Sequence, residues 1–114
     1  MPDIDRDALD QFLRDVGPIA AKRLAGVFAA ETRRRAEAAA RLSAAGPGPD
    51  LRREAHSLKS AARTYGAAGI AEAARALEDA CDRNRAAEIV PLARALTETV
   101  ERDLPRFEAI IAAL

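Results

Sequence analysis

Apolar residues recur every three or four positions along most of the chain, and this spacing predicts amphipathic α-helices. Glycine and proline interrupt the pattern at intervals, where helices are expected to end. The pattern shows neither the alternation of a β-strand nor an internal repeat, so we predict an all-α fold. Five helices are expected, over about residues 5–16, 18–44, 50–65, 67–84 and 87–113.

Residues with known preferences for helix ends refine these boundaries. Asp3 or Asp5 can cap the first helix, and Asp50 is expected to cap the third. Gly66 should end the third helix in a left-handed conformation. Pro105 lies well inside the last helix, so we expect it to kink that helix or to split it.

These helices predict an antiparallel, up-and-down four-helix bundle over residues 18–113, with a short N-terminal helix covering one end. At 114 residues the chain is expected to form a single domain spanning 1–114. Alanine-rich faces allow close helix packing, both within the chain and between two chains. The sequence therefore leaves monomer and dimer open.

Composition argues against several classes of protein. Eighteen basic and eighteen acidic residues balance, and stacking aromatics are few, which argues against a nucleic-acid-binding protein. No apolar run approaches the roughly 20 residues of a membrane span. The acidic amino terminus does not resemble a signal peptide, and the single cysteine, Cys81, is expected in the core. We therefore expect a cytoplasmic protein.

The only histidine, His56, is expected to lie outside the core. It falls about 140° from the apolar stripe of its helix. That stripe consists of Leu51, Ala55, Leu58, Ala62 and Tyr65. The neighbours of His56 on the outer face are Arg52, Arg53, Lys59, Ser60 and, two turns on, Arg63. Glu54 falls on the far flank, so we expect no carboxylate of this helix beside the imidazole.

A histidine in this setting has four interpretations. It can be a core residue, an exposed residue without a task, a metal ligand, or a nucleophile and anion contact. The position of His56 about 140° from the apolar stripe argues against a core residue. A single histidine and a single cysteine are too few for a typical metal site. An imidazole can accept a phosphoryl group covalently, and nearby cations would offset the charge that arrives with it.

The residues around His56 resemble the histidine-containing phosphotransfer (HPt) domain of bacterial phosphorelays. That family carries a histidine, a leucine two residues on, a lysine three on, a small residue four on and a glycine ten on. The matching residues are His56, Leu58, Lys59, Ser60 and Gly66, followed later by Leu77 and Glu78. Ser60 departs from the commoner glycine, although both residues are small.

This resemblance implies a phosphoryl carrier without kinase or ATPase activity of its own. His56 would accept the phosphoryl group from a receiver-domain aspartate and pass it to another receiver, while Lys59 contacts the phosphoryl oxygens. The residues expected to bind the partner are Arg52, Arg53, Ser60, Arg63 and Gly66. Response-regulator receiver domains and a hybrid histidine kinase are the expected partners. No cofactor is expected on this chain, because the receiver would supply the Mg²⁺.

Two other classes of function stay open. One is a helical interaction module that binds and inhibits a kinase or response regulator without being phosphorylated. The other is a nucleic-acid or anion-binding bundle that uses the arginines of the second and third helices. The run Arg33-Arg34-Arg35 is better explained as a solvated helix face, where Glu31 and Glu37 can pair with it. The identity of the partners and the direction of phosphoryl flow are not encoded in these patterns.

Overall fold

The computed structural model describes residues 3–114, and this part of the chain is all-helical, as predicted. The helices are α1 (Arg6–Val16), α2 (Pro18–Leu42), α3 (Pro49–Thr64), α4 (Ala68–Asp82) and α5 (Ala86–Ala112). A short 3₁₀ helix, Ser43–Ala45, follows α2. Met1 and Pro2 lie outside the described residues. They belong to the amino-terminal segment in which no signal peptide is expected.

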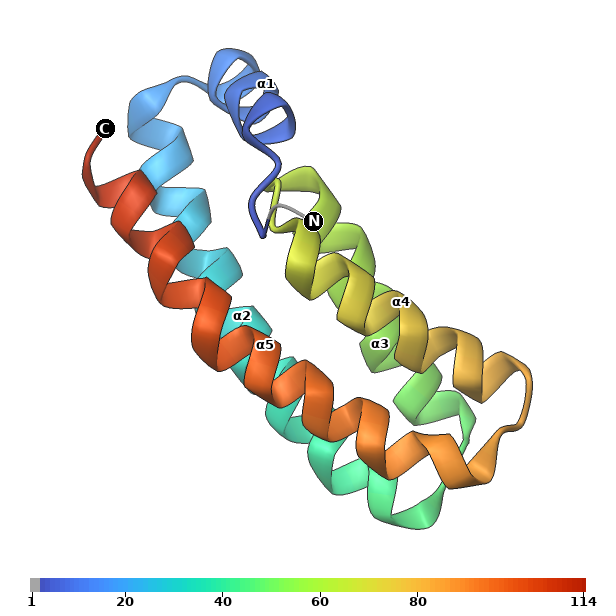
Figure 1. Ribbon diagram of the computed structural model, residues 1–114. Helices are drawn as coiled ribbons and strands as arrows, with labels where there is room; N and C mark the ends of the chain where they lie inside the picture. The colour runs from blue at the N-terminus through green and yellow to red at the C-terminus, as the bar shows by residue number, and fades with distance from the viewer. Residues whose placement is uncertain (1–2) are drawn as a thin grey trace.

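The four longer helices lie side by side along one axis (Figure 1). α3 packs against α2 and α4, and α5 packs against α4 and α2, so each of the four has two neighbours. The molecule measures 42 × 22 × 21 Å. A helix of the length of α5 spans about 40 Å, so the helices themselves set the long dimension.

The core between these helices is built from leucine, isoleucine and many alanines. Leu58, Ile70, Leu77 and Leu96 are at most 1% exposed. The alanines let the helices approach closely, because a methyl group is the smallest apolar side chain. Cys81 is half-buried against this core, and burial raises the pKa of its thiol.

α1 lies across one end of the molecule and buries Leu9 and Phe12 there (Figure 1). Beneath it the rings of Phe28 and Tyr65 stack with centroids 4.4 Å apart. The ring of Phe12 lies 4.6 Å from Tyr65, so α1 closes an aromatic cluster. This short helix is amphipathic, and its apolar side has no place to be buried except on the end of the core.

The start of α1 is tied down by its backbone and its cap. The Asp5 carboxylate accepts a hydrogen bond from the Ala8 amide at 3.1 Å, so the aspartate predicted as one of two possible caps is confirmed. The Asp5 amide donates to the Gly66 carbonyl at 2.7 Å. Asp3 pairs with Arg106 of α5 at 2.5 Å. The N-terminal helix is therefore attached both to the α3–α4 turn and to α5.

Three expected boundaries need correction or comment. Asp50 does not cap α3, because the helix begins one residue earlier at Pro49, whose fixed φ suits a first helical position. α5 is not split at Pro105 but continues to Ala112. Pro105 and Glu101 are both exposed, so water can reach the carbonyl that the proline leaves without a donor. Gly66 does adopt the predicted left-handed conformation, with φ 76°.

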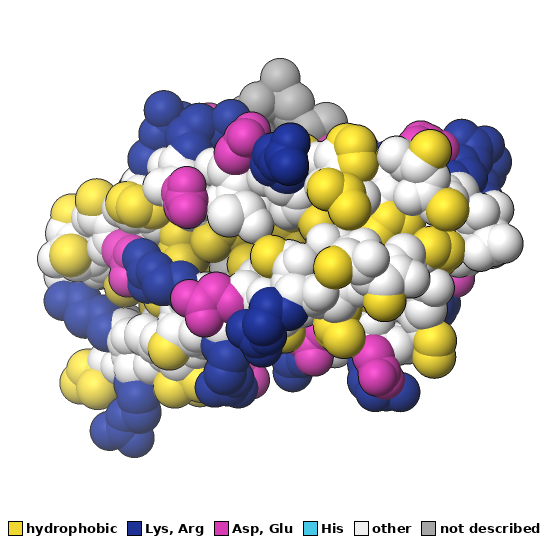
Figure 2. Space-filling view, turned by 90° about the horizontal axis from the view of Figure 1, so that it is seen from below, with side chains coloured by type: hydrophobic (Ala, Val, Ile, Leu, Met, Phe, Trp, Pro, Cys, Tyr) yellow, Lys and Arg dark blue, Asp and Glu magenta, His cyan; other side chains and the backbone are white. Residues whose placement is uncertain are grey.

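Charges of both signs are interspersed on the surface (Figure 2). Arg33 pairs with Glu108 at 2.6 Å, and Arg34 and Arg35 both pair with Glu31, so the arginine run is a solvated helix face, as expected. Glu37 was also expected to pair with this run but has no ion pair among the residues described. Across residues 3–114, no helix combines the length and the apolar content needed to cross a membrane.

Candidate functional site

His56 lies midway along α3 and its side chain is 51% exposed. The prediction that it points away from the core is confirmed, since Leu51, Ala55 and Leu58 of the same helix are buried. The helical period places the histidine and this apolar stripe on different sides of one rigid rod. His56 is therefore presented on a defined element instead of a loop.

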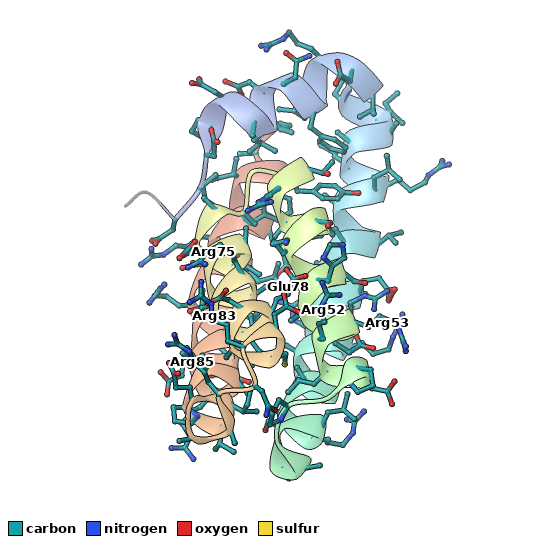
Figure 3. All side chains as sticks on the ribbon, turned by 90° about the vertical axis from the view of Figure 1, so that its right-hand side faces the viewer. Arg52, Arg53, Arg75, Glu78, Arg83 and Arg85 are labelled. Atoms are coloured by element: carbon teal, nitrogen blue, oxygen red, sulfur yellow. The ribbon has the colours of Figure 1, made fainter. Side chains whose placement is uncertain are left out.

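A carboxylate from the neighbouring helix contacts the imidazole. Oε2 of Glu78 in α4 lies 2.7 Å from Nδ1 of His56, and Glu78 is only 7% exposed. In Figure 3 Glu78 lies between α3 and α4, with Arg52 beside it. We expected no carboxylate from the helix that carries His56, and none is there. The anion beside the ring comes instead from the adjacent helix, which the spacing along α3 could not indicate.

Two cations share this buried carboxylate with the histidine. The Lys59 ammonium donates to Oε1 of Glu78 at 2.5 Å and is only 17% exposed. Arg52 lies 3.4 Å from Oε2 of Glu78, and its Nε donates to Asp82 at 2.5 Å. Glu78 thus joins His56, Lys59 and Arg52 into one cluster, which we call the Glu78 cluster.

The charge state of Glu78 decides which nitrogen of the neutral ring carries the proton. Burial by itself would raise the pKa of Glu78, but hydrogen bonds from Lys59 and His56 and their charges outweigh it. The pKa is therefore lowered from its ordinary value of 4.5, and the carboxylate is ionised at neutral pH. An ionised carboxylate only accepts hydrogen bonds, so the ring donates through Nδ1. In the neutral imidazole the lone pair is then on Nε2.

The remaining predicted residues lie elsewhere on α3. Arg53 is 70% exposed and pairs with Asp50 at 3.1 Å, and Ser60 is exposed one turn from His56. Arg63 is exposed two turns from His56, in a cavity that it lines together with Glu72. These three side chains follow one exposed side of α3, but the structure does not gather them into the Glu78 cluster.

Gly66 does not lie on the exposed side of the helix. It is buried, and a Cβ added there would meet the Asp5 carbonyl oxygen at 2.5 Å and the Leu9 amide at 3.0 Å. It is ten residues from His56, or about 15 Å along a helix. The expectation that Gly66 contributes to the partner-binding surface needs correction, because this glycine makes room for α1.

Sequence reasoning missed Glu78 as a functional residue, although a signal was present. Glu78 follows Ala71 and Ala74 by seven and four residues, which puts it on the buried side of α4. A carboxylate at a core position requires partners, because a buried unpaired charge is costly. That requirement points to basic side chains on a facing helix, and Lys59 and His56 fulfil it.

An apolar surface adjoins the histidine side of α3. A shallow groove of about 200 Å³ between α2 and α3 is lined by Val27 together with Ser57 and Ala61, which flank His56 and Ser60 in the sequence. Val27 is 57% exposed. In the part of the chain that the structure covers, no group of three or more His, Cys, Asp or Glu residues is arranged to hold a metal ion.

The chain was compared with known protein families, curated proteins and solved structures. The model of the Hpt domain family matches residues 23–114, which include α3, α4, α5 and most of α2. No curated protein and no solved structure matches the chain.

Proposed function

The chain belongs to the Hpt domain family, and from this premise we propose that it is a phosphorelay carrier whose phosphoryl acceptor is His56. The observation that carries the proposal is the contact between Nδ1 of His56 and the buried Glu78 carboxylate at 2.7 Å. This contact holds the proton on Nδ1 and leaves Nε2 as a lone-pair nucleophile on a half-exposed ring. A nucleophile oriented by a third group is the arrangement that covalent catalysis requires.

Transfer to His56 begins with an aspartyl phosphate on a receiver domain. Nε2 attacks the phosphorus, so that an N–P bond forms while the bond between phosphorus and the aspartate oxygen breaks. The electron pair of that bond returns to the receiver's aspartate as a carboxylate. The proton stays on Nδ1, so the ring becomes a phosphorylated imidazolium whose positive charge faces Glu78. The reverse steps deliver the phosphoryl group to another receiver.

Cations near the ring would stabilise the arriving charge. Lys59, bound to Glu78 on one side, is placed one helical turn from His56, where it can also contact a phosphoryl oxygen. Arg52 is one turn away in the other direction. Ser60 presents a small side chain beside the ring and leaves room for the phosphoryl group. The receiver would contribute the Mg²⁺ and most of the catalysis.

Docking of the receiver would use the exposed side of α3 and the neighbouring part of α2. Arg53 and Arg63 present positive charge to an acidic receiver pocket, while Val27 presents apolar surface. Hpt domains interact with receiver domains and histidine kinases in two-component systems. We propose response-regulator receivers and a hybrid histidine kinase as the partners of this chain.

We propose three further features of this chain. They are an antiparallel, up-and-down topology for α2 to α5, a single domain over residues 1–114 and a cytoplasmic location. The short connections between successive helices and the two neighbours of each helix support this topology.

The test is phosphoryl transfer from a purified, radiolabelled receiver. The wild-type chain should acquire an acid-labile label, and His56→Gln should acquire none while retaining its helical circular dichroism. Arg83→Gln, on an exposed pair with Asp79 in α4, is the control and should be labelled like wild type. Equal labelling of the His56→Gln variant would refute the assignment of the acceptor.

The non-phosphorylated interaction module makes the opposite prediction. It requires a stable complex with a kinase or receiver whose affinity and inhibitory effect are the same for wild type and His56→Gln. Titration calorimetry with the same receiver, combined with the labelling experiment, distinguishes the two functions.

A further inference from the structure

A second surface lies between α2 and α5, the pair of helices that does not carry His56. Two adjoining cavities of about 370 and 250 Å³ run along it and share Ala40 and Thr97 in their linings. Half of the lining residues have small side chains: Ala36, Ala40, Ser43, Ala93, Thr97 and Val100. We call this surface the α2–α5 groove. Its small side chains would let another helix approach closely.

Some charged side chains of α2 and α5 are paired within the chain and others are not. Arg33, Arg102 and Arg106 each pair with an acidic side chain of this chain. By contrast, Glu37, Arg41, Arg94, Glu98 and Glu101 form no ion pair with any residue in 3–114, and all five are exposed. Four of these five side chains, two acidic and two basic, are placed symmetrically along their helices.

The order of residues along α5 is self-complementary. Val90, Arg94, Glu101 and Pro105 lie within about 60° on one side of the helix. Arg94 and Glu101 are equally distant from a midpoint between residues 97 and 98, and Val90 and Pro105 share that midpoint. In an antiparallel pair of α5 helices centred there, Arg94 would face Glu101 and Val90 would face Pro105 of the other copy.

α2 has the same property at the same level of the groove. Glu37 and Arg41 are equally distant from Ala39. Ala40, next to that midpoint, and Thr97, next to the midpoint of α5, line the same cavities. One two-fold axis can therefore pass through both midpoints. It would bring Glu37 opposite Arg41 and Glu101 opposite Arg94 of the other copy.

We propose that the α2–α5 groove is a homodimer interface, in which a second copy of this chain packs antiparallel about that two-fold axis. The interface is isologous, so every contact occurs twice, and Glu37, Arg41, Arg94 and Glu101 of each copy form reciprocal ion pairs. A partner of uniform charge would satisfy only half of them. The inference is independent of phosphoryl transfer, since none of its residues belongs to the Glu78 cluster.

The dimer would leave both phosphorylation sites accessible. His56 lies on α3 and contacts Glu78 of α4, whereas the groove lies between α2 and α5. Two receivers could therefore dock on one dimer, one on each copy.

Sedimentation equilibrium of the full chain over a wide concentration range tests the proposal. Wild type should fit a monomer–dimer equilibrium that weakens with salt. Arg94→Glu and Glu101→Arg should each raise the dissociation constant at least about tenfold, because each places like charges opposite one another. A wild-type chain that stays monomeric at every concentration would overturn the proposal.

Mixing the two single variants gives the sharper result. In a heterodimer of Arg94→Glu with Glu101→Arg, both reciprocal contacts again join opposite charges, so the mixture should dimerise like wild type. The double variant carrying both substitutions should dimerise as well. Failure of both combinations to restore the dimer, with circular dichroism intact, would show that these residues do not face one another.

Arg75→Glu is the matched control. Arg75 lies on α4, which does not pack against α2, and it pairs with Glu72 at 2.7 Å. The same charge reversal there should leave the dissociation constant unchanged. An equal effect of Arg75→Glu would indicate a general response to net charge and would contradict the assigned interface.

Discussion

At the scale of single residues, the chemistry of His56 depends on a buried carboxylate. Glu78 accepts hydrogen bonds from His56 at 2.7 Å and from Lys59 at 2.5 Å. The ion pair with Lys59 keeps Glu78 charged in spite of its burial, and the charged carboxylate fixes the proton on Nδ1. In the proposed transfer, Lys59 would therefore act on the histidine through Glu78 as well as directly on the phosphoryl group.

Replacing Glu78 with glutamine tests this arrangement. The amide retains the shape of the side chain and can still accept from Nδ1, but it does not stabilise the imidazolium that forms on transfer. A hydrogen bond to a charged group is worth roughly 1 kcal/mol more than one to a neutral group, so transfer to His56 should slow about fivefold. Rapid-quench transfer kinetics measure this rate.

Glu72→Gln is the control for that measurement. Glu72 is on the same helix and its pKa is lowered chiefly by a hydrogen bond from Arg75, without contact with His56. Its substitution should leave the transfer rate unchanged. A Glu78→Gln variant as fast as this control would remove Glu78 from the mechanism.

The lowered pKa of Glu78 predicts how the stability of the folded chain changes with pH. Its pKa is lower in the folded chain than its ordinary value of 4.5, so the folded state holds the proton less tightly than the unfolded state. The resulting stabilisation is fully present above that ordinary value and is lost as pH falls through the folded-state pKa. Urea unfolding should therefore show a difference between wild type and Glu78→Gln that is constant near neutral pH and shrinks below about pH 4. A difference that grows on acidification would contradict the lowered pKa.

At the scale of elements, the α3–α4 turn connects the site helix to α1. Gly66 ends α3 with a positive φ and passes directly beneath the backbone of Asp5 and Leu9. The turn therefore both orients α3 against α4, which the His56–Glu78 contact needs, and provides the seat of the covering helix.

Gly66→Ala should disturb the contact between this turn and α1. A left-handed φ and a Cβ placed 2.5 Å from the Asp5 carbonyl oxygen both oppose the substitution. We expect a loss of about 1–3 kcal/mol in the free energy of unfolding, accompanied by proteolytic release of α1. Chemical denaturation and limited proteolysis measure the two effects.

Gly26→Ala is expected to change the free energy of unfolding in the opposite direction. Gly26 lies in α2, and nothing lies within 4 Å of the position that an alanine methyl group would take there. Alanine should therefore stabilise the helix by about 0.5–1 kcal/mol. If both variants changed stability in the same direction, close packing at Gly66 would be the wrong explanation.

At the scale of the whole molecule, the proposed docking surface combines charge from α3 with apolar surface from α2. Arg63 and Val27 come from different helices, and both are exposed. Exposed charges mainly accelerate association and are screened by salt, whereas apolar contacts are not.

The two contributions predict different salt dependence. Arg63→Glu should weaken receiver binding strongly at low ionic strength and little at high ionic strength. Val27→Ser should weaken it by a similar factor at both, since it removes apolar contact area. Binding isotherms at two salt concentrations measure this contrast. Loss of affinity for Arg63→Glu that persists in high salt would mean that steering is not its role.

The sequence alone was sufficient for the helices and for the exposure of His56. Helical period, cap residues and proline are local properties, so they predicted five helices and the left-handed Gly66. They failed at Asp50, where Pro49 starts the helix instead, and they left open the effect of Pro105, which α5 accommodates without splitting. These differences arise where exposure to water or a neighbouring residue decides between two permitted local conformations.

Tertiary structure alone decided what faces the histidine. Glu78 lies 22 residues from His56 in the sequence, and Gly66 is covered by a segment from the amino terminus. Helical periodicity determines which side of a helix a residue occupies, but not which helix will pack beside it or in what rotation. The sequence therefore determined that a solvent-facing imidazole exists, and the packing of α4 against α3 determined which of its nitrogens is free to react.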